Sequence, residues 1–238
     1  MQNIYFLGIG GIGMSALARY FHNKGNRVSG YDKTPSPLTK KLEEEGILIH
    51  YEDNPNLIPE DIDFVILTPA IPKDSQELNC LQSKNIRIIK RAEVLGEISQ
   101  HCKSVAVGGT HGKTTVTALT THILNSAGKK MSAFIGGIAK NINSNVIIGD
   151  ENDEIVVMEA DEFDRSFLHL TPYISIITSI DADHLDIYGD EQQLVDAFSQ
   201  FANKTVENGI VIHSEYVSIE TNRKKITYGF DDADVLAK

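Results

Sequence analysis

The sequence has little of what marks secreted, membrane-bound or nucleic-acid-binding proteins. Its 238 residues contain two cysteines, Cys80 and Cys102, which are too few for a disulfide framework and too far apart for a CxxC site, so a reducing cytoplasm is expected. The N-terminal apolar run lacks a preceding cationic region and is soon broken by glycines, which predicts neither a signal peptide nor a membrane span. The net charge of −11 argues against a general nucleic-acid or membrane-surface binder, but it allows a local pocket for a phosphorylated small molecule.

Internal repeats, low-complexity tracts and Pro/Ser-rich linkers are also missing from the sequence. Its apolar content of 41% and charged content of 23% are those of a soluble globular protein. Short apolar runs alternate with amphipathic stretches, a rhythm typical of βαβ units in a parallel sheet. The predicted strands are 3–8, 26–31, 62–67, 86–89, 154–158, 173–179 and 209–213. The predicted helices are 12–24, 37–45, 75–84, 91–100 and 190–206.

The first glycine-rich stretch, FLGIGGIGMSALA (6–18), joins a predicted strand to a predicted helix. Gly8, Gly10 and Gly13 form G-x-G-x-x-G, and Asp32 follows nineteen residues after Gly13. This spacing is typical of a dinucleotide-binding turn, where glycines let the backbone approach a diphosphate at the start of a helix. A UDP diphosphate satisfies the same N–H groups. Asp32 ends the second strand, where it either reaches a ribose or uracil or serves as a capping or solvated residue.

A second glycine turn, GGTHGKTT (108–115), follows another strand and opens another helix. It predicts a site for a nucleoside triphosphate, with Lys113 at the β- and γ-phosphates and the hydroxyl of Thr114 on Mg²⁺. The usual G-x-x-x-x-G-K-[ST] pattern needs glycine at position 107, where Val107 stands instead. This second strand–glycine–helix start, within 104–124, indicates a new domain rather than one large sheet.

Apolar spacing predicts which faces of two helices in this second domain are buried. In the helix that follows the second glycine turn, residues three and four apart mark one face: Val116, Leu119, Ile123 and Ala127. In the helix at 190–206, the inner face is formed by Leu194, Phe198, Phe201 and Thr205 or Val206.

Two further strands are expected to supply carboxylates for the metal. The strand within EIVVMEADEFD (154–164) ends with Glu159 and Asp161 on one face, and Glu159 is the predicted metal ligand because it lies nearest the strand end. Glu162 and Asp164 are expected to be solvated loop residues. The strand YISIITSI runs into DADHLD (181–186), which we expect to open on the same edge as the glycine turn. Because Mg²⁺ prefers oxygen, chemistry alone favours Asp181 or Asp183 over His184 as a ligand.

These motifs, together with TYGF (227–230), resemble in order those of the Mur ligases of peptidoglycan synthesis. The resemblance implies a Rossmann-like parallel-sheet domain for a UDP-sugar at 1–102 and a P-loop-type α/β domain for MgATP at 103–238. In this family a shortened G-T-x-G-K-[ST] loop is usual, which accounts for Val107. A family asparagine is replaced here by Ser179, so any role of that side chain is not carried over.

The resemblance also implies the site residues. For ATP they are Gly108, Gly109, Thr110, His111, Gly112, Lys113, Thr114 and Thr115. The implied metal ligands are Thr114, Glu159 and His184, and the implied catalytic residues are Lys113, Glu159 and His184. For the UDP-sugar they are Gly8, Gly10, Gly11, Ile12, Gly13, Met14, Ser15, Asp32, Thr68 and Ala70.

The activity implied by the resemblance is an ATP-dependent ligation of L-alanine to the lactyl carboxylate of UDP-N-acetylmuramate through an acyl phosphate. Family members carry a third domain, so we expect this chain to be the N-terminal portion of a ligase, with a truncated central domain and no C-terminal domain. Such a portion is expected to bind substrate without turnover. The alternative is a naturally short relative. Rival functions are a ligase that recycles a tripeptide onto the same sugar, an NAD-dependent dehydrogenase, and a P-loop switch or binding module.

Overall fold

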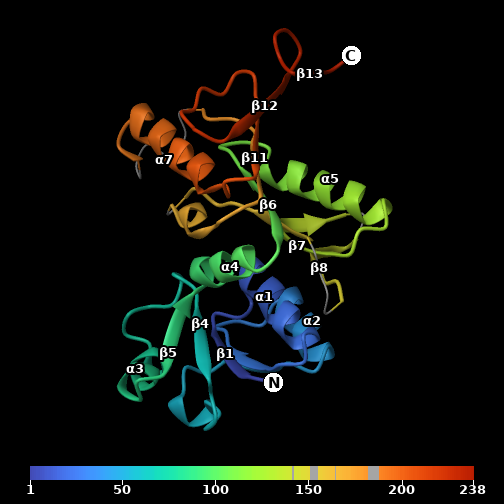
Figure 1. The fold of residues 1–238 in the computed structure, drawn as a ribbon. Coiled ribbons are helices and arrows are strands. Elements are labelled where there is room, and N and C mark those ends of the chain that lie inside the picture. The colour runs from blue at the N-terminus through green and yellow to red at the C-terminus, as the bar shows by residue number, and fades with distance from the viewer. Residues whose placement is uncertain (141, 151–154, 164, 182–187) are drawn as a thin grey trace. The chain divides into compact units, whose positions relative to one another are not determined.

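The computed structural model describes residues 1–140, 142–150, 155–163, 165–181 and 188–238. The chain forms two compact units, Met1–Val94 and Leu95–Lys238. Each unit is built around its own largely parallel β-sheet (Figure 1), so the α/β class predicted from the sequence is confirmed. No helix of the described residues is long and apolar enough to cross a membrane.

The first unit has a five-stranded sheet in the order β3-β2-β1-β4-β5, and all its strand pairs are parallel. Its strands are β1 (Asn3–Leu7), β2 (Arg27–Tyr31), β3 (Leu48–His50), β4 (Phe64–Leu67) and β5 (Arg87–Lys90). Its helices are α1 (Ile12–Asn23), α2 (Pro37–Glu44), the 3-10 helix η1 (Pro55–Leu57) and α3 (Gln76–Ser83). Four strands were predicted, and β3 is additional because three residues are too few to show a period of two.

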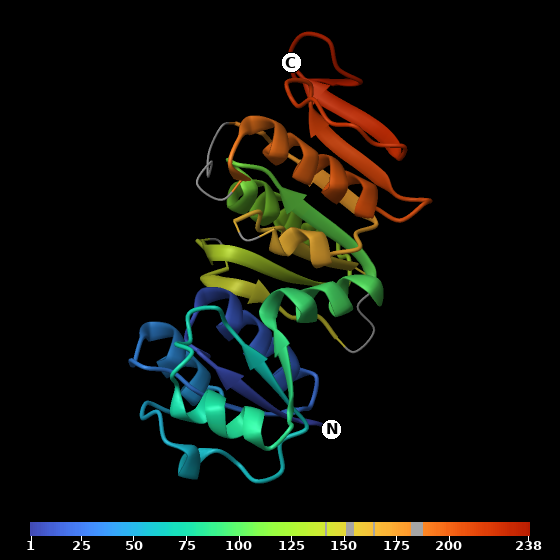
Figure 2. The same ribbon diagram turned by 90° about the vertical axis from the view of Figure 1, so that its left-hand side faces the viewer.

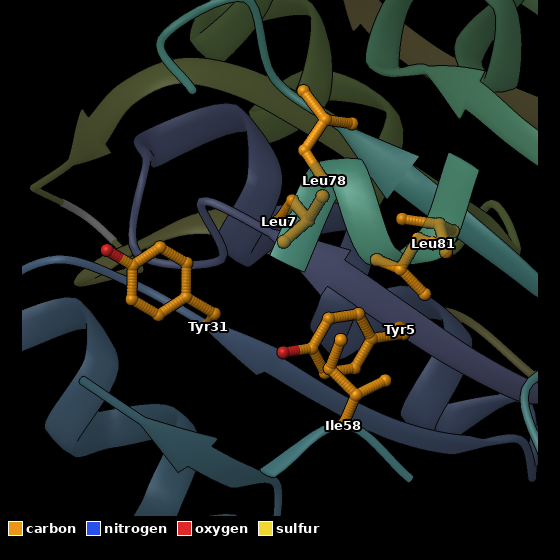
Figure 3. Close-up of a cluster of buried hydrophobic side chains, with 7 residues drawn as sticks. Tyr5, Leu7, Tyr31, Ile58, Leu78 and Leu81 are labelled. Atoms are coloured by element: carbon orange, nitrogen blue, oxygen red, sulfur yellow. The ribbon is translucent and has the colours of Figure 1, made fainter. Parts of the chain in front are cut away.

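The core of the first unit lies on both faces of β1. Tyr5 and Leu7 pack against Leu78 and Leu81 of α3 (Figure 3), together with Tyr31, Ile58 and Val65. The alternate residues Ile4 and Phe6, which face the other side of the sheet, are also buried. A strand that is apolar on both faces is typical of a parallel sheet with helices on each side.

This core contains one buried carboxylate, that of Glu77 on α3, which is 0% exposed. Its Oε2 accepts a hydrogen bond from the Tyr5 hydroxyl, and its Oε1 accepts one from the backbone N–H of Asn54 at 3.0 Å. The Tyr5 oxygen also lies 2.7 Å from Nε2 of His50. Burial raises the pKa of Glu77 above its ordinary value of 4.5, and burial together with this carboxylate raises the pKa of Tyr5. Tyr5 therefore remains a protonated donor.

The second unit has an eight-stranded sheet in the order β13-β12-β11-β10-β6-β9-β7-β8. Its pairs are parallel except for β7 and β8, which are antiparallel. The strands are β6 (Lys103–Gly108), β7 (Met131–Ala139), β8 (Ser144–Ile147), β9 (Ile155–Glu159), β10 (Ile174–Ile177), β11 (Ile210–Ser214), β12 (Lys224–Gly229) and β13 (Val235–Leu236). Helix α4 (Arg91–Gln100) spans the division between the units, and α5 (Lys113–Ser126), the 3-10 helix η2 (Ser166–His169) and α7 (Glu191–Lys204) follow.

Helices α5 and α7 lie on opposite faces of this sheet (Figures 1 and 2). The prediction for α7 is confirmed, since Leu194, Phe198 and Phe201 are 0% exposed; the next inner position is Thr205, also 0% exposed.

The prediction for the face of α5 is wrong. Leu119 and Ile123 are 55% and 63% exposed, whereas Thr117 and Thr121 are buried. Leu124 continues the buried side against Met131 and Val157. Helix α5 packs against β7 and β9, so the buried Thr117 and Thr121 mark the side of the helix that faces the sheet.

Candidate functional site

The first glycine turn lies at the carboxyl edge of the five-stranded sheet, where the strand order changes direction between β1 and β4. Such switch points are where open α/β sheets bind ligands. A cavity of about 810 Å³ is present here. Six of the ten residues predicted for the UDP-sugar line it: Gly8, Gly10, Gly11, Asp32, Thr68 and Ala70.

The close approach of neighbouring chains explains why glycines occupy this turn. Gly8 has φ +85°, and a Cβ there would lie 2.4 Å from the Cγ2 of Thr68. A Cβ on Gly10 would lie 2.8 Å from Oδ2 of Asp32, which accepts the Gly10 N–H at 2.7 Å. Asp32 also accepts the N–H of Thr34 at 3.3 Å. In this structure Asp32 therefore holds the turn in shape.

The other four predicted residues lie on α1, which starts after Gly11 without a side-chain cap. Met14 and Ser15 are each 1% exposed, so neither presents its side chain to a ligand in this structure. A Cβ on Gly13 would lie 2.4 Å from Nη1 of Arg91, so this glycine lets Arg91 pack against the helix. Ile12 is 39% exposed at the start of α1.

The cavity has further lining residues that the sequence did not single out. Asp53 is one of them, and it fixes the start of α3 by accepting the N–H groups of Gln76 and Glu77 at 3.0 and 2.9 Å. The remainder are Tyr31, Lys33, Thr34, Ser36, Ile71, Pro72, Asp74, Ser75 and Gln76. Apart from Tyr31 at the end of β2 and Gln76 at the start of α3, they come from the loops that follow β2, β3 and β4. The parallel topology brings these loops to one edge of the sheet.

The second glycine turn joins β6 to α5 in the middle of the eight-stranded sheet. Gly112, with φ +81°, is the N-cap of α5 and provides no side chain to the helix N-terminus. Gly109 has φ +140°, and a Cβ there would lie 2.1 Å from the Thr178 hydroxyl. The loop is therefore a tight backbone turn whose helix N-terminus presents N–H groups and a positive dipole end, the arrangement that binds phosphate.

The strands on each side of β6 end at the same edge. Glu159 on β9 is in register with Val107, and Ile177 on β10 is in register with Gly108. The prediction that β10 opens beside the glycine turn and Glu159 is thus confirmed.

Thr114 and Glu159, two of the predicted metal ligands, are in direct contact. The Thr114 hydroxyl donates to Oε1 of Glu159 at 3.1 Å, and the N–H of Gly136 donates to Oε2 at 3.0 Å. A Cβ on Gly136 would lie 2.4 Å from Oε1 of Glu159, so only glycine lets β7 pass so close to the carboxylate. A hydroxyl and a carboxylate held together are donors that suit Mg²⁺.

His184 and Asp183 lie outside the described residues, as does Asp164. Within the described ranges, no group of three or more His, Cys, Asp or Glu side chains is gathered as a metal site. The metal role of His184 therefore stays a prediction.

Lys113 forms an ion pair that the sequence did not predict. Its Nζ donates to Oε1 of Glu162 and to the carbonyl of Gly109, each at 2.8 Å. Glu162 is 1% exposed, so its interpretation as a solvated loop residue is wrong. The chain turns back after Asp161, where the N–H of Phe167 donates to the Asp161 carbonyl at 3.0 Å, and this turn keeps Glu162 inside.

Residues after β10 hold the tip of the second glycine turn. The Ser179 hydroxyl accepts the N–H of His111 at 3.0 Å and lies 2.9 Å from the hydroxyl of Thr110. Oδ2 of Asp181 lies 3.1 Å from Nδ1 of His111 and accepts from the Thr110 hydroxyl at 3.3 Å. Ser179 and Asp181 thus fix the loop conformation. Thr115, the third residue of α5, is exposed.

Fold and sites together define a two-unit α/β protein with a phosphate-type turn in each unit. The model of the Mur ligase family, catalytic domain, matches residues 3–103, and that of the Mur ligase middle domain matches residues 107–238. The chain belongs to the Mur ligase family.

Its relatives include two curated enzymes named UDP-N-acetylmuramate–L-alanine ligase. That of Christiangramia forsetii is 48% identical, with 93% of this chain and 52% of the relative covered. That of Flavobacterium psychrophilum is 55% identical, with 86% and 46% covered. The solved UDP-N-acetylmuramate-alanine ligase of Thermotoga maritima is 30% identical with a TM-score of 0.85, over 98% of this chain and 54% of its own. The chain thus spans about half the length of the relatives it matches.

Proposed function

We propose that this chain binds the sugar nucleotide and the ATP in an ATP-dependent ligase that joins L-alanine to the lactyl carboxylate of UDP-N-acetylmuramate. The observation that carries the proposal is the second glycine turn, with Lys113 and Thr114 at the start of α5 and Glu159 bonded to Thr114. The names of relatives 48% and 55% identical to this chain support the choice of substrates. All these substrates are small and polar, which is consistent with the proposed cytoplasmic location.

In this proposal the first turn holds the UDP-sugar. The glycines of this turn let the diphosphate approach the N–H groups at the start of α1, and the cavity of about 810 Å³ takes the nucleoside. Asp32 keeps the glycine backbone in position through the Gly10 N–H. Thr68 and Ala70, which line the same cavity, complete its wall beside β4.

The second turn positions the reacting phosphate. A carboxylate is a poor acyl donor, so the lactyl carboxylate attacks the γ-phosphorus of ATP and displaces ADP, and the resulting acyl phosphate has a good leaving group. The amine of L-alanine then attacks the acyl carbon, and the tetrahedral intermediate loses a proton and expels phosphate to form the amide. Lys113 offsets the negative charge of the phosphoryl group, and the N-terminus of α5 orients it. A magnesium ion held by Thr114, Glu159 and His184 supplies further charge neutralisation when bound.

The rival functions explain less of the structure. A dehydrogenase uses only the first turn and leaves Lys113, Thr114 and Glu159 without a role. A tripeptide-recycling ligase fits the same two sites, and a solved murein peptide ligase of Psychrobacter arcticus is 26% identical with a TM-score of 0.77. The higher identity to the alanine ligases favours L-alanine, and offering L-alanine and tripeptide in turn to the complete enzyme separates the two activities.

Calorimetric titration with UDP-N-acetylmuramate, MgATP and NADH, each alone, tests the binding roles. We expect the sugar nucleotide and MgATP to bind and NADH not to bind. The variant Lys113→Ala should weaken MgATP at least tenfold, because it removes the charge at the phosphates, and leave the UDP-sugar unchanged. Lys130→Ala, which removes an exposed lysine of the same unit, is the matched control. Binding of NADH, or equal MgATP affinity of Lys113→Ala and the wild type, would contradict the proposal.

A further inference from the structure

The pairing of Lys113 with Glu162 places a negative charge inside a site proposed to bind a polyphosphate. The Lys113 side chain is 17% exposed and that of Glu162 is 1% exposed, and their Nζ···Oε1 distance is 2.8 Å. A carboxylate beside a triphosphate opposes binding through like-charge repulsion. If Glu162 contributes to binding, a second effect of this carboxylate must offset its repulsion of the triphosphate.

The geometry of the lysine ammonium suggests that effect. An ammonium group has three N–H donors. In the described residues, one of them goes to the Gly109 carbonyl and one to Glu162. Both acceptors are fixed, since Gly109 belongs to the tight turn and Glu162 is buried. Two fixed acceptors determine the direction of the third N–H, which is the donor left for an incoming oxygen.

Glu162 is itself firmly held. Its carbonyl accepts the N–H of Arg165 at 3.0 Å and also the hydroxyl of Tyr188. The guanidinium of Arg165 lies over the Tyr188 ring, 5.2 Å from its centroid. The backbone of Glu162 is therefore anchored by the turn after β9, and its position does not depend on Lys113.

We propose that Glu162 is the positioning residue of Lys113: it holds the ammonium before nucleotide binds, and it remains the partner of that ammonium while the third N–H donates to a phosphate oxygen. Removing a buried partner leaves an uncompensated charge, so exchange of Glu162 for phosphate is disfavoured and a shared ammonium is favoured. This inference rests on the proposed ATP site.

The first test measures how fast Lys113 reacts with an amine-acylating ester at fixed pH, read by mass spectrometry. We compare the wild type with Glu162→Gln, which keeps the shape and removes the charge. A held and shielded ammonium reacts slowly, so we expect labelling of Lys113 to rise about tenfold or more in the variant. The control is Asp150→Asn, which breaks the exposed pair that Lys130 and Asp150 form at 2.7 Å; labelling of Lys130 should change less than twofold.

The second test adds magnesium and inorganic tripolyphosphate to the same reaction. We expect tripolyphosphate to protect Lys113 from labelling in the wild type. In Glu162→Gln, the tripolyphosphate concentration that gives half-maximal protection should be at least fivefold higher, because Glu162 no longer orients the third N–H of the ammonium. Unchanged labelling of Lys113 in the variant would overturn the inference. If tripolyphosphate still protects Lys113 in the wild type, the proposed ATP site stands. Equal protection of both proteins would likewise overturn the inference. Absence of protection in the wild type would overturn the ATP site and the inference together.

A ligand-free measurement guards against a variant that folds poorly. Melting midpoints of wild type, Lys113→Met, Glu162→Gln and the double variant form a double-mutant cycle. We expect Lys113→Met to lower the midpoint most, since it leaves Glu162 buried without its cation, and the added Glu162→Gln to restore part of the loss. Additive shifts would show that the two side chains are not coupled and would refute the inference.

Discussion

The buried Tyr5–Glu77 hydrogen bond gives a prediction that needs no ligand. The change Tyr5→Phe keeps the ring in the core of the first unit (Figure 3) and removes only the hydroxyl. Oε2 of Glu77 then loses its donor, while Oε1 keeps the Asn54 N–H at 3.0 Å. His50 loses its 2.7 Å contact as well. The variant therefore removes one donor from a fully buried carboxylate together with one contact to His50.

The size of the effect follows from these contacts. A hydrogen bond to a charged group contributes about 1.5–3 kcal/mol, and the unchanged ring leaves little new cavity, so we expect a loss of about 2 kcal/mol in the free energy of unfolding. In a unit of this size, Met1–Val94, 1 kcal/mol shifts the melting midpoint by about 4–8 °C. The expected shift is thus about 8–16 °C for the first unit.

Amide hydrogen exchange is the suitable assay, because a chain of two units need not unfold in a single transition. A loss of 2 kcal/mol should speed exchange in β1 and β4 about thirtyfold. Tyr216→Phe is the control: its hydroxyl donates to Asp231 at 3.2 Å, but Tyr216 is 72% exposed, so almost no change is expected. A Tyr5→Phe effect below about 0.5 kcal/mol would refute the assignment of Glu77 as a buried charge that depends on this donor.

Two further predictions concern carboxylates. Gly136→Ala would bring a Cβ to 2.4 Å from Glu159, so the carboxylate must move; we expect at least tenfold weaker magnesium-dependent ATP binding by calorimetry. A smaller loss of ATP affinity is expected for Gly137→Ala, whose Cβ would meet only Thr114 at 3.2 Å. Equal ATP affinities of Gly136→Ala and the wild type would contradict the proposed metal role of Glu159. Burial raises the pKa of Glu77 in the folded unit above its ordinary value of 4.5. Between pH 4.5 and the raised pKa, the folded unit binds more protons than the unfolded chain. Its stability therefore falls as the pH rises through that window. Urea unfolding at a series of pH values above 4.5 should show this slope in the wild type and not in Glu77→Gln; parallel slopes would count against it.

Local signals predicted much of the fold. Each glycine turn follows a short apolar strand and precedes a helix, and such strand–turn–helix units are set by neighbours in sequence. The alternation within 154–158 also put Glu159 at the end of its strand, where the structure has it. Strands β7, β8, β12 and β13 were not predicted. Two glycines interrupt the apolar run MSAFIGGIA of β7, and β13 has only two residues.

The errors have a common cause, which is that burial depends on packing partners distant in sequence. Counting only aliphatic residues marked Leu119 and Ile123 as a core face, whereas the buried residues of this helix include Thr117 and Thr121. Glu162 stands beyond the last residue of its strand and has the composition of a loop. The sequence signal that could have predicted the burial of Glu162 was Lys113. This lysine lies at a helix start without an acidic residue nearby in sequence, so its partner must come from a distant segment.

The central place of β6 has a consequence for synthesis of the chain. In the first unit β1 pairs with β2 and β4, so its glycine turn is supported once the residues up to Leu67 are available. Strand β6 instead waits for β9 and β10. Ile177 follows Gly108 by 69 residues, which a ribosome adds in roughly 3–14 s. The second glycine turn therefore forms late, and a nascent chain completes the fold of its first unit well before the second turn is supported by its neighbouring strands.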